Sequence, residues 1–136
     1  MARRSILFIP ALLAFCLGCG GSSAGLVPLP CHPAAGSLFI GGKPAAGATI
    51  VFRPTVETPD MQVPYPRATI GPDGTFQLST YGANDGAPVG EYGFTVAWAG
   101  DEGGDRLKGK YESPEKTAKT VKIVAGDNKL PPIKLP

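Results

Sequence analysis

The sequence has little of what catalysis by side chains requires. Its 136 residues include one histidine, His32, and one tryptophan. A hydrolytic triad needs a base that is held close to a nucleophile, and this histidine stands beside Cys31 with no carboxylate cluster near it in the sequence. We interpret Cys31 and His32 as linker residues rather than as a metal-binding or nucleophilic pair. We therefore predict a protein that is not an enzyme, with no catalytic residue, no metal site and no cofactor.

Long helical segments are also missing. The 19 glycines and 15 prolines interrupt any long helix, and no stretch after Leu17 keeps the 3.6-residue period of an amphipathic helix. The longest apolar run, residues 5–17, is shorter than the roughly 20 residues that a membrane-spanning helix needs. These absences favour an all-β protein and indicate that the apolar run is a targeting signal.

The first residues are typical of a secretory signal peptide. Residues 1–4 give a basic start, residues 5–17 are apolar, and Gly18 and Gly20 place small residues around Cys19. A basic start, an apolar run and a cleavage region with small residues follow one another in signal peptides, which are removed on export.

Residues 16–19, with the sequence Cys-Leu-Gly-Cys, resemble the lipobox of bacterial lipoproteins. That family normally has leucine where this chain has Cys16. The resemblance implies that residues 1–18 are a cleaved signal peptide and that Cys19 carries acyl chains, two or more of which hold a protein stably on a membrane. An ordinary signal peptide cleaved nearby and an uncleaved anchor remain as alternatives.

Loss of the leader changes the cysteine and charge counts. With Cys19 acylated, Cys31 is the only thiol of the mature chain, whereas a free Cys19 could pair with Cys31 in an oxidising compartment. The full chain has a formal charge of +2, but Arg3 and Arg4 leave with the leader, and 11 basic residues then face 11 acidic ones. Because a near-neutral chain has no electrostatic attraction for nucleic acid, we exclude nucleic acid as a partner.

The rest of the chain divides into a tether and one domain. Residues 19–35 are rich in small residues and proline and are interpreted as a flexible tether, and residues 36–136 have the size of one small domain. Short runs of alternating apolar residues, bounded by turn residues, predict an all-β, seven-stranded sandwich of two sheets. The seven expected strands are 36–40, 48–53, 67–70, 75–80, 91–99, 120–124 and 130–135.

The strand 91–99 has the clearest alternation. Tyr92, Phe94, Val96 and Trp98 occupy every second position and are predicted to face the core, with Trp98 in the core or at its rim.

The dipeptide Asp73-Gly74 predicts a tight hairpin turn between the third and fourth strands. Phe76 and Leu78 would then point into the core.

Three segments resemble the carboxypeptidase regulatory-like domain. They are Gly36-x-Leu38 with residues 42–52, Asp73-Gly74-x-Phe76-x-Leu78, and Gly90-Glu91-Tyr92-x-Phe94-x-Val96.

With its leader, the chain is similar to small secreted lipoproteins of planctomycete-type bacteria that contain this domain, and the match covers most of residues 36–135. The resemblance implies a transthyretin-like, or prealbumin-like, sandwich in which the motif residues build turns and core. Residues 69–72, Thr-Ile-Gly-Pro, depart from the Thr-Asp pair that often precedes the turn. The related transthyretin-like hydrolases that act on hydroxyisourate end in Tyr-Arg-Gly-Ser, which this chain lacks, so that activity is not expected.

The remaining polar clusters have structural explanations. Asp101, Glu102 and Asp105 could offer oxygen ligands to Ca²⁺, but their order does not match a known calcium loop, and whether they bind the ion stays open. Asp85-Gly86 and Asp127-Asn128 are interpreted as turns.

A basic stretch could meet anionic polysaccharide or lipid headgroups. Lysines beside an exposed strand also prevent edge-to-edge aggregation, and we prefer that explanation. Trp98 and Tyr111 could form an aromatic surface for carbohydrate, although the rim of the core is the preferred place for Trp98. The basic residues are Arg106, Lys108, Lys110, Lys116, Lys119 and Lys122.

These patterns predict a non-catalytic binding or structural accessory module. It would be exported and lipid-anchored through Cys19 to a membrane of the cell envelope, at the outer membrane or the periplasmic face, with an envelope protein or polysaccharide as partner. The alternative is a soluble periplasmic carrier that holds a small apolar ligand between its sheets or between subunits.

Overall fold

The computed structural model describes residues 28–57 and 63–136, and in this part nearly all of the regular secondary structure is β-strand, joined by turns and loops. The all-β prediction is confirmed, and each of the seven expected segments contains a strand. The number of strands differs, because the described residues contain eleven, of which four are only two residues long. The strands are β1 (Cys31–His32), β2 (Ala34–Ile40), β3 (Lys43–Pro44), β4 (Thr49–Pro54), β5 (Arg67–Thr69), β6 (Thr75–Gln77), β7 (Ala87–Pro88), β8 (Gly90–Ala97), β9 (Val121–Ile123), β10 (Asn128–Lys129) and β11 (Ile133–Leu135), and the one-turn helix α1 is Pro114–Thr117.

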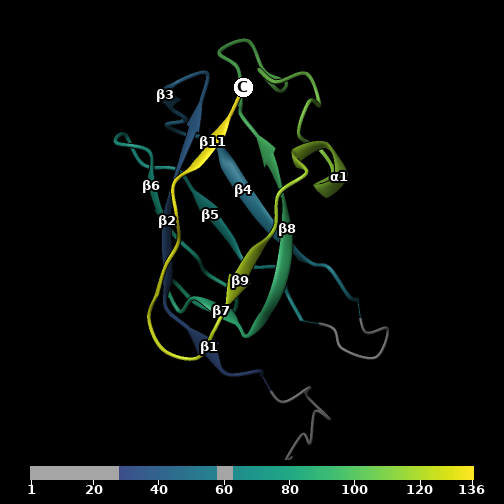
Figure 1. The fold of residues 1–136 in the computed structure, drawn as a ribbon. Coiled ribbons are helices and arrows are strands. Elements are labelled where there is room, and N and C mark those ends of the chain that lie inside the picture. Colours follow the sequence, from purple (N-terminus) through teal and green to yellow (C-terminus); the bar gives the residue numbers. More distant parts are fainter. Residues whose placement is uncertain (1–27, 58–62) are drawn as a thin grey trace, which may run out of the picture.

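Two sheets face each other (Figure 1). In the first sheet, β2 is central and pairs antiparallel with β3 and β6 along one edge and parallel with β10 and β11 along the other. The second sheet is antiparallel throughout, in the order β5-β4-β8-β9. The ribbon of β1 and β7 lies at one end of the sandwich, which we call the β1 end. The opposite end, with β3, the carboxy terminus and the loop after β8, is the β3 end.

The core lies between the sheets and follows the predicted alternation. Phe52, Phe94 and Leu38 are fully buried, and Phe76 and Tyr92 are only 4% exposed. The ring of Phe52 has its centroid 6.4 Å from that of Phe76 and 6.0 Å from those of Tyr92 and Phe94. Because Phe76 belongs to the first sheet and the others to the second, this cluster joins the two sheets. Such aromatic pairs contribute about 0.5–1.5 kcal/mol each beyond the burial of their area.

The hairpin predicted at Asp73-Gly74 is present only in part: the turn forms, and Arg67 and Ser79 make an antiparallel bridge across it, but β5 and β6 pair mainly with other strands. The amide of Gly74 donates to the carbonyl of Gly71 at 2.9 Å, and Asp73 Oδ1 accepts the amide of Thr75 at 3.1 Å. The turn carries the chain from the second sheet to the first, because β5 pairs with β4 and β6 pairs with β2. This crossing lets the apolar residues of both strands face the same core from opposite sides.

The last expected strand is divided in two. Pro131 and Pro132 have no backbone N–H, so the chain leaves the ladder between β10 and β11. Both strands run parallel to β2, with Asn128 opposite Ala34 and Ile133 opposite Leu38. Between these two pairs the chain of β10 and β11 advances by five residues and β2 by four. The segment between β10 and β11 therefore contains one extra residue, as in a β-bulge.

The folded part begins earlier than expected. Cys31 and His32 pair with β7, and Ala34 is buried at the start of β2. The boundary at residue 36 and the description of Cys31 and His32 as linker residues are therefore wrong. Residues 1–27, with Cys16, the predicted signal peptide and Cys19, lie outside the described residues.

We expect Gly86→Ala to destabilise the β1 end. Gly86 has φ of +91°, and an added Cβ would overlap the carbonyl of His32. Gly126→Ala is the matched control, because its φ is +95° but a Cβ there meets no atom within 4 Å. The control loses about 1–2 kcal/mol of unfolding free energy for its positive φ, and Gly86→Ala loses about 1–3 kcal/mol more for the overlap. Urea denaturation measures both, and equal losses would contradict the close approach of β1.

Candidate functional site

The predicted attachment residue, Cys19, lies outside the described residues, so lipidation stays a prediction. Within residues 28–57 and 63–136, no helix is long and apolar enough to cross a membrane. The polar residues that the sequence singled out are distributed between the two ends of the sandwich.

Cys31 and His32 are held apart by the fold. They are neighbours in β1, so their side chains point to opposite sides of the ribbon. Burial raises the pKa of the Cys31 thiol, whose Sγ lies 3.7 Å from the carbonyl of Leu29. His32 Nδ1 accepts the amide of Gly126 at 3.1 Å. A thiol with a raised pKa is a poorer nucleophile at neutral pH, and the histidine nitrogen is already used to hold a loop.

Asp85 organises the loop between β6 and β7. Its Oδ1 accepts the amide of Thr80 at 2.7 Å, and its Oδ2 accepts the amides of Tyr81 at 2.9 Å and Gly82 at 3.0 Å. Partial burial acts to raise the pKa of Asp85, but these backbone hydrogen bonds outweigh it and lower the pKa. The interpretation of Asp85-Gly86 as part of a turn is confirmed, because the Asp85 carboxylate accepts three backbone amides of this loop.

Asp105 organises the loop after β8, at the β3 end, in the way that Asp85 organises its loop. Its Oδ1 accepts the amides of Trp98 at 2.9 Å and Leu107 at 3.0 Å, and its Oδ2 accepts the amide of Gly109 at 3.0 Å. The bonds from Trp98 and Gly109 are the main reason why the pKa of Asp105 is lowered. Both oxygens of Asp105 therefore already have donors.

The other acidic residues of this loop are not gathered around Asp105. Asp101 makes an exposed ion pair with Arg106, with 3.3 Å between Oδ1 and the guanidinium, and such pairs contribute little. Glu102 is exposed. In the part of the chain that the structure describes, no group of three or more His, Cys, Asp or Glu side chains is placed to hold a metal ion.

Asn128 is a buried polar residue that the sequence marked only as a turn. It is 8% exposed. Its Oδ1 accepts the amide of Val124 at 2.9 Å, and its Nδ2 donates to the carbonyls of Val124, Gly126 and Pro33. The side chain thus fastens the turn between β9 and β10 to the chain just before β2. The role depends on a partner 95 residues away, which no local pattern reveals.

The basic stretch is divided among local contacts. The guanidinium of Arg106 lies 5.0 Å from the centre of the Trp98 ring, and Lys116 Nζ lies 2.7 Å from Glu112 Oε1. Lys110 Nζ donates to the carbonyl of Pro136 at 3.3 Å. These basic side chains are therefore already engaged with groups of the same chain.

Tyr111 is not available for the aromatic surface considered as an alternative for Trp98 and Tyr111. Tyr111 is 3% exposed, and its hydroxyl donates to the carbonyl of Pro136 at 2.8 Å. Trp98 packs partly buried against the core, as expected, and its Nε1 donates to the carbonyl of Ala46 at 2.9 Å.

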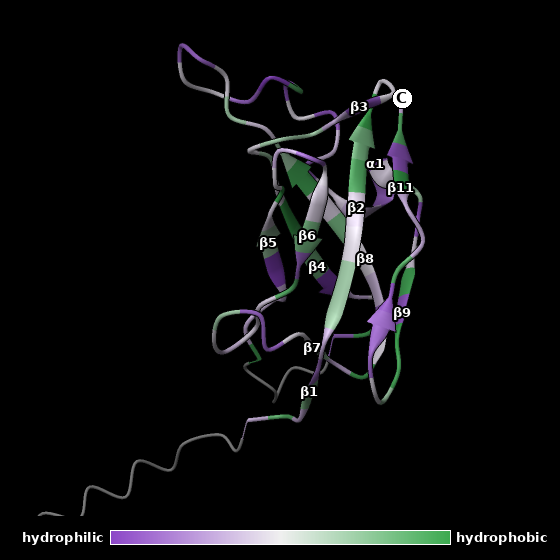
Figure 2. Cartoon of the chain, turned by 90° about the vertical axis from the view of Figure 1, so that its left-hand side faces the viewer, coloured by the Kyte–Doolittle hydropathy of each residue, from purple (hydrophilic) through white to green (hydrophobic). Residues whose placement is uncertain are grey.

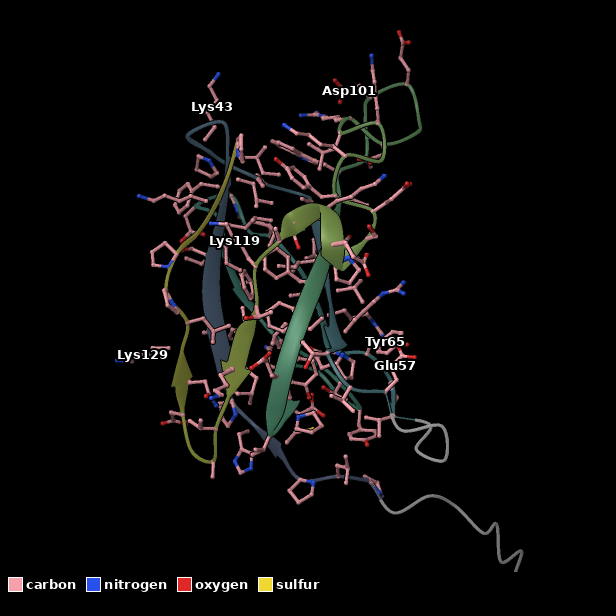
Figure 3. The ribbon with its side chains drawn as sticks, turned by 45° about the vertical axis from the view of Figure 1, so that its right-hand side comes forward. Lys43, Glu57, Tyr65, Asp101, Lys119 and Lys129 are labelled. Carbon is pink, nitrogen blue, oxygen red and sulfur yellow. The ribbon has the colours of Figure 1, made fainter. Side chains whose placement is uncertain are left out.

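A cluster that the sequence left unassigned lies on the outer face of the second sheet. The hydroxyl of Tyr65 donates to Glu57 Oε1 at 2.7 Å, and the guanidinium of Arg53 lies 5.3 Å from the centre of the Tyr65 ring (Figure 3). The hydrogen bond to Glu57 raises the pKa of Tyr65. Arg53 and Glu57, with Lys119 beside α1, also line an open groove of about 480 Å³. Its lining mixes both signs of charge, so it favours no single class of ligand.

A second open hollow, of about 670 Å³, follows the outer face of the first sheet and the edges of β5 and β6. Small and polar residues line it, among them Ser37, Thr75 and Gln77, and Lys129 lies at its border. Neither hollow brings together a nucleophile, a base and an oxyanion donor.

Asp85→Asn should lower the unfolding free energy by about 1 kcal/mol, because it removes the negative charge and replaces one of the two acceptor oxygens with an NH2 group that cannot accept the backbone amides. Because the pKa of Asp85 is lowered in the folded state, this contribution is complete above its ordinary value of 3.8 and disappears as the pH falls through the lowered value. The difference between wild type and variant should therefore stay constant above about pH 5 and shrink towards pH 2. Urea denaturation over this range measures it, and Asp127→Asn, on an exposed side chain, is the control. A difference that does not change with pH would contradict the assigned role.

Comparison of this chain with family models, with curated proteins and with solved structures finds no match.

Proposed function

We propose that this chain is an exported lipoprotein, anchored to a membrane of the cell envelope through Cys19, and that its sandwich is a non-catalytic accessory module that binds or supports another envelope component. The observation that carries the proposal is the leader of residues 1–18, which is followed directly by Cys19, while the folded part begins twelve positions later at Cys31. A signal peptide directs export, and its lipobox-like end supports attachment of lipid at Cys19.

The use of polar side chains supports the absence of catalysis. Asp85 and Asp105 accept backbone amides with both carboxylate oxygens, His32 accepts a loop amide, and Asn128 fastens a turn. In active sites, by contrast, such groups are aimed at a cleft where a substrate can bind. Here their hydrogen bonds shape the loops of the sandwich.

The position of the first strand supports attachment through the amino terminus. A chain of twelve residues spans at most about 40 Å when fully extended. A lipid on Cys19 would therefore keep the β1 end within this distance of the membrane, while the β3 end points away.

We also infer that the domain is a prealbumin-like sandwich of the carboxypeptidase regulatory-like type. When the four two-residue strands are set aside, seven strands remain, three in the first sheet (β2, β6 and β11) and four in the second (β4, β5, β8 and β9). The motif residues Tyr92, Phe94 and Val96 are buried, in agreement with a structural role. This division and these buried residues support the family resemblance.

The carrier alternative has less support. A carrier that holds a ligand between its sheets needs space there, and around Phe52 that space is occupied by the rings of Phe76, Tyr92 and Phe94.

Intact mass and detergent partitioning of the protein from a bacterial host that processes lipoproteins test the anchor. We expect wild type and Cys31→Ser to gain the mass of acyl chains and to enter the detergent phase, because two or more chains bind a membrane stably. Cys19→Ser should lose both properties. A wild-type protein that is unmodified and fully aqueous would refute the proposal.

A further inference from the structure

We propose that the β1 end of the sandwich is a lipid-contacting surface, so that the domain rests on the membrane through this end. The surface consists of four exposed residues, Val56, Tyr81, Val89 and Val124, which we call the apolar rim. The inference rests on the proposed lipid anchor and adds to it a fixed orientation and a second contact with the bilayer.

The apolar rim contains four of the five most exposed large hydrophobic side chains in the described residues. Val56 is 79% exposed, Val89 59%, Val124 53% and Tyr81 43%. Single exposed apolar residues are ordinary on protein surfaces, but a group at one end needs an explanation. The fifth, Tyr65, lies on the flank and donates its hydroxyl to Glu57.

Strand register places three valines at neighbouring ends of β4, β8 and β9. Val89 comes directly before Gly90 and Val124 directly after Ile123, and Gly90 and Ile123 are partners in the ladder of β8 and β9. Val56 follows Thr55, whose amide donates to the carbonyl of Glu91 at 3.0 Å on the other side of β8. Three neighbouring strands of the second sheet thus each end in an exposed valine.

Tyr81 connects the rim to the incoming chain. Its hydroxyl accepts the amide of Leu29 at 3.1 Å, two residues before β1. An aromatic ring with a polar tip suits the boundary between lipid tails and water.

The β3 end has the opposite character. Lys43 and Asp101 project from it into solvent (Figure 3), and the long loop after β8 is mostly hydrophilic (Figure 2). The chain therefore has an apolar end where it meets its predicted anchor and a polar end away from it.

Lipid is the occupant that the chain connection favours. The acyl chains on Cys19 are twelve residues from β1, so they hold the rim at a high effective concentration near the bilayer. Weak apolar contacts then suffice, because the anchor has already confined the domain to the surface. Exposed side chains of both signs lie near the rim, with Glu57, Glu91 and Asp127 against Lys122, which favours a zwitterionic over an anionic surface.

The test uses the full chain, lipidated in a bacterial host and reconstituted into phosphatidylcholine vesicles. Vesicles with brominated acyl chains quench a tryptophan that touches the lipid. Trp98, the only native tryptophan, packs near the β3 end and serves as an internal reference. Val89→Trp and Val124→Trp report on the rim, and Lys43→Trp, exposed at the β3 end, is the matched control. Circular dichroism checks that each variant keeps its β-structure.

We expect brominated lipid to reduce the emission added at positions 89 and 124 by about twofold, because these side chains would lie at the interface. The emission of wild type and of Lys43→Trp should stay almost unchanged. Equal quenching at positions 43, 89 and 124, or none at 89 and 124, in a protein whose mass confirms the lipid would overturn the orientation. Protection of positions 89 and 124 from acrylamide without quenching by brominated lipid would show that protein covers the rim, and it would also overturn the inference.

A mass without acyl chains would refute the proposed function instead. The same variants, mixed with vesicles as unlipidated protein, would then test whether the apolar rim contacts lipid without an anchor. Quenching at positions 89 and 124 would support a lipid-contacting surface, and its absence would overturn it.

Discussion

Pairing along both edges of β2 is the constraint on which the rest of the structure depends. This strand pairs with the antiparallel strands β3 and β6 on one side and with the parallel strands β10 and β11 on the other. The amide of Leu38 donates to Gly74 and its carbonyl accepts from Ala45, while Leu38 itself is fully buried. Because β2 lies near the start of the described chain and β11 near its end, the first sheet is complete only when the whole domain has folded.

The two sheets are then held together by the aromatic cluster around Phe52 and closed at each end by polar side chains. At the β1 end, the hydroxyl of Tyr92 donates to the carbonyl of Pro88 at 2.8 Å, and burial raises the pKa of Tyr92 to about 12. Asp85 and Asn128 fasten the loops there, and Asp105 fastens the loop at the other end. These four polar side chains are thus bound to backbone groups and shape the ends of the sandwich.

Much of the fold could be predicted from the sequence, since alternating apolar residues mark strands with one buried face. This alternation predicts that Phe76 and Leu78, and Tyr92 with Phe94, face the core, and all four are buried. The two-residue strands could not be predicted, because two residues show no period. The turn at Asp73-Gly74 serves equally well within a sheet or between sheets, so local sequence does not decide which strands pair.

The roles of the polar and exposed residues were harder to predict than the strands, because they depend on residues that are distant in the sequence and close in space. The role of Asn128 requires Pro33, far away in the chain, and the burial of Tyr111 requires the carboxy terminus. In the sequence, Val124 ends an expected strand and Val89 lies shortly before another, and neither position is marked as a surface contact. Only the register of β8 and β9 shows that they lie past the end of the ladder, where no strand covers them.

Hydrogen exchange of individual amides, followed by nuclear magnetic resonance, tests the central position of β2 most directly. If β2 holds the first sheet together, the amide of Leu38 should exchange only through global unfolding, with the same dependence on denaturant as unfolding itself. The amide of Gly126, in a surface turn, should exchange through small local openings. Exchange of the Leu38 amide at the rate of such a turn, independent of denaturant, would contradict the account.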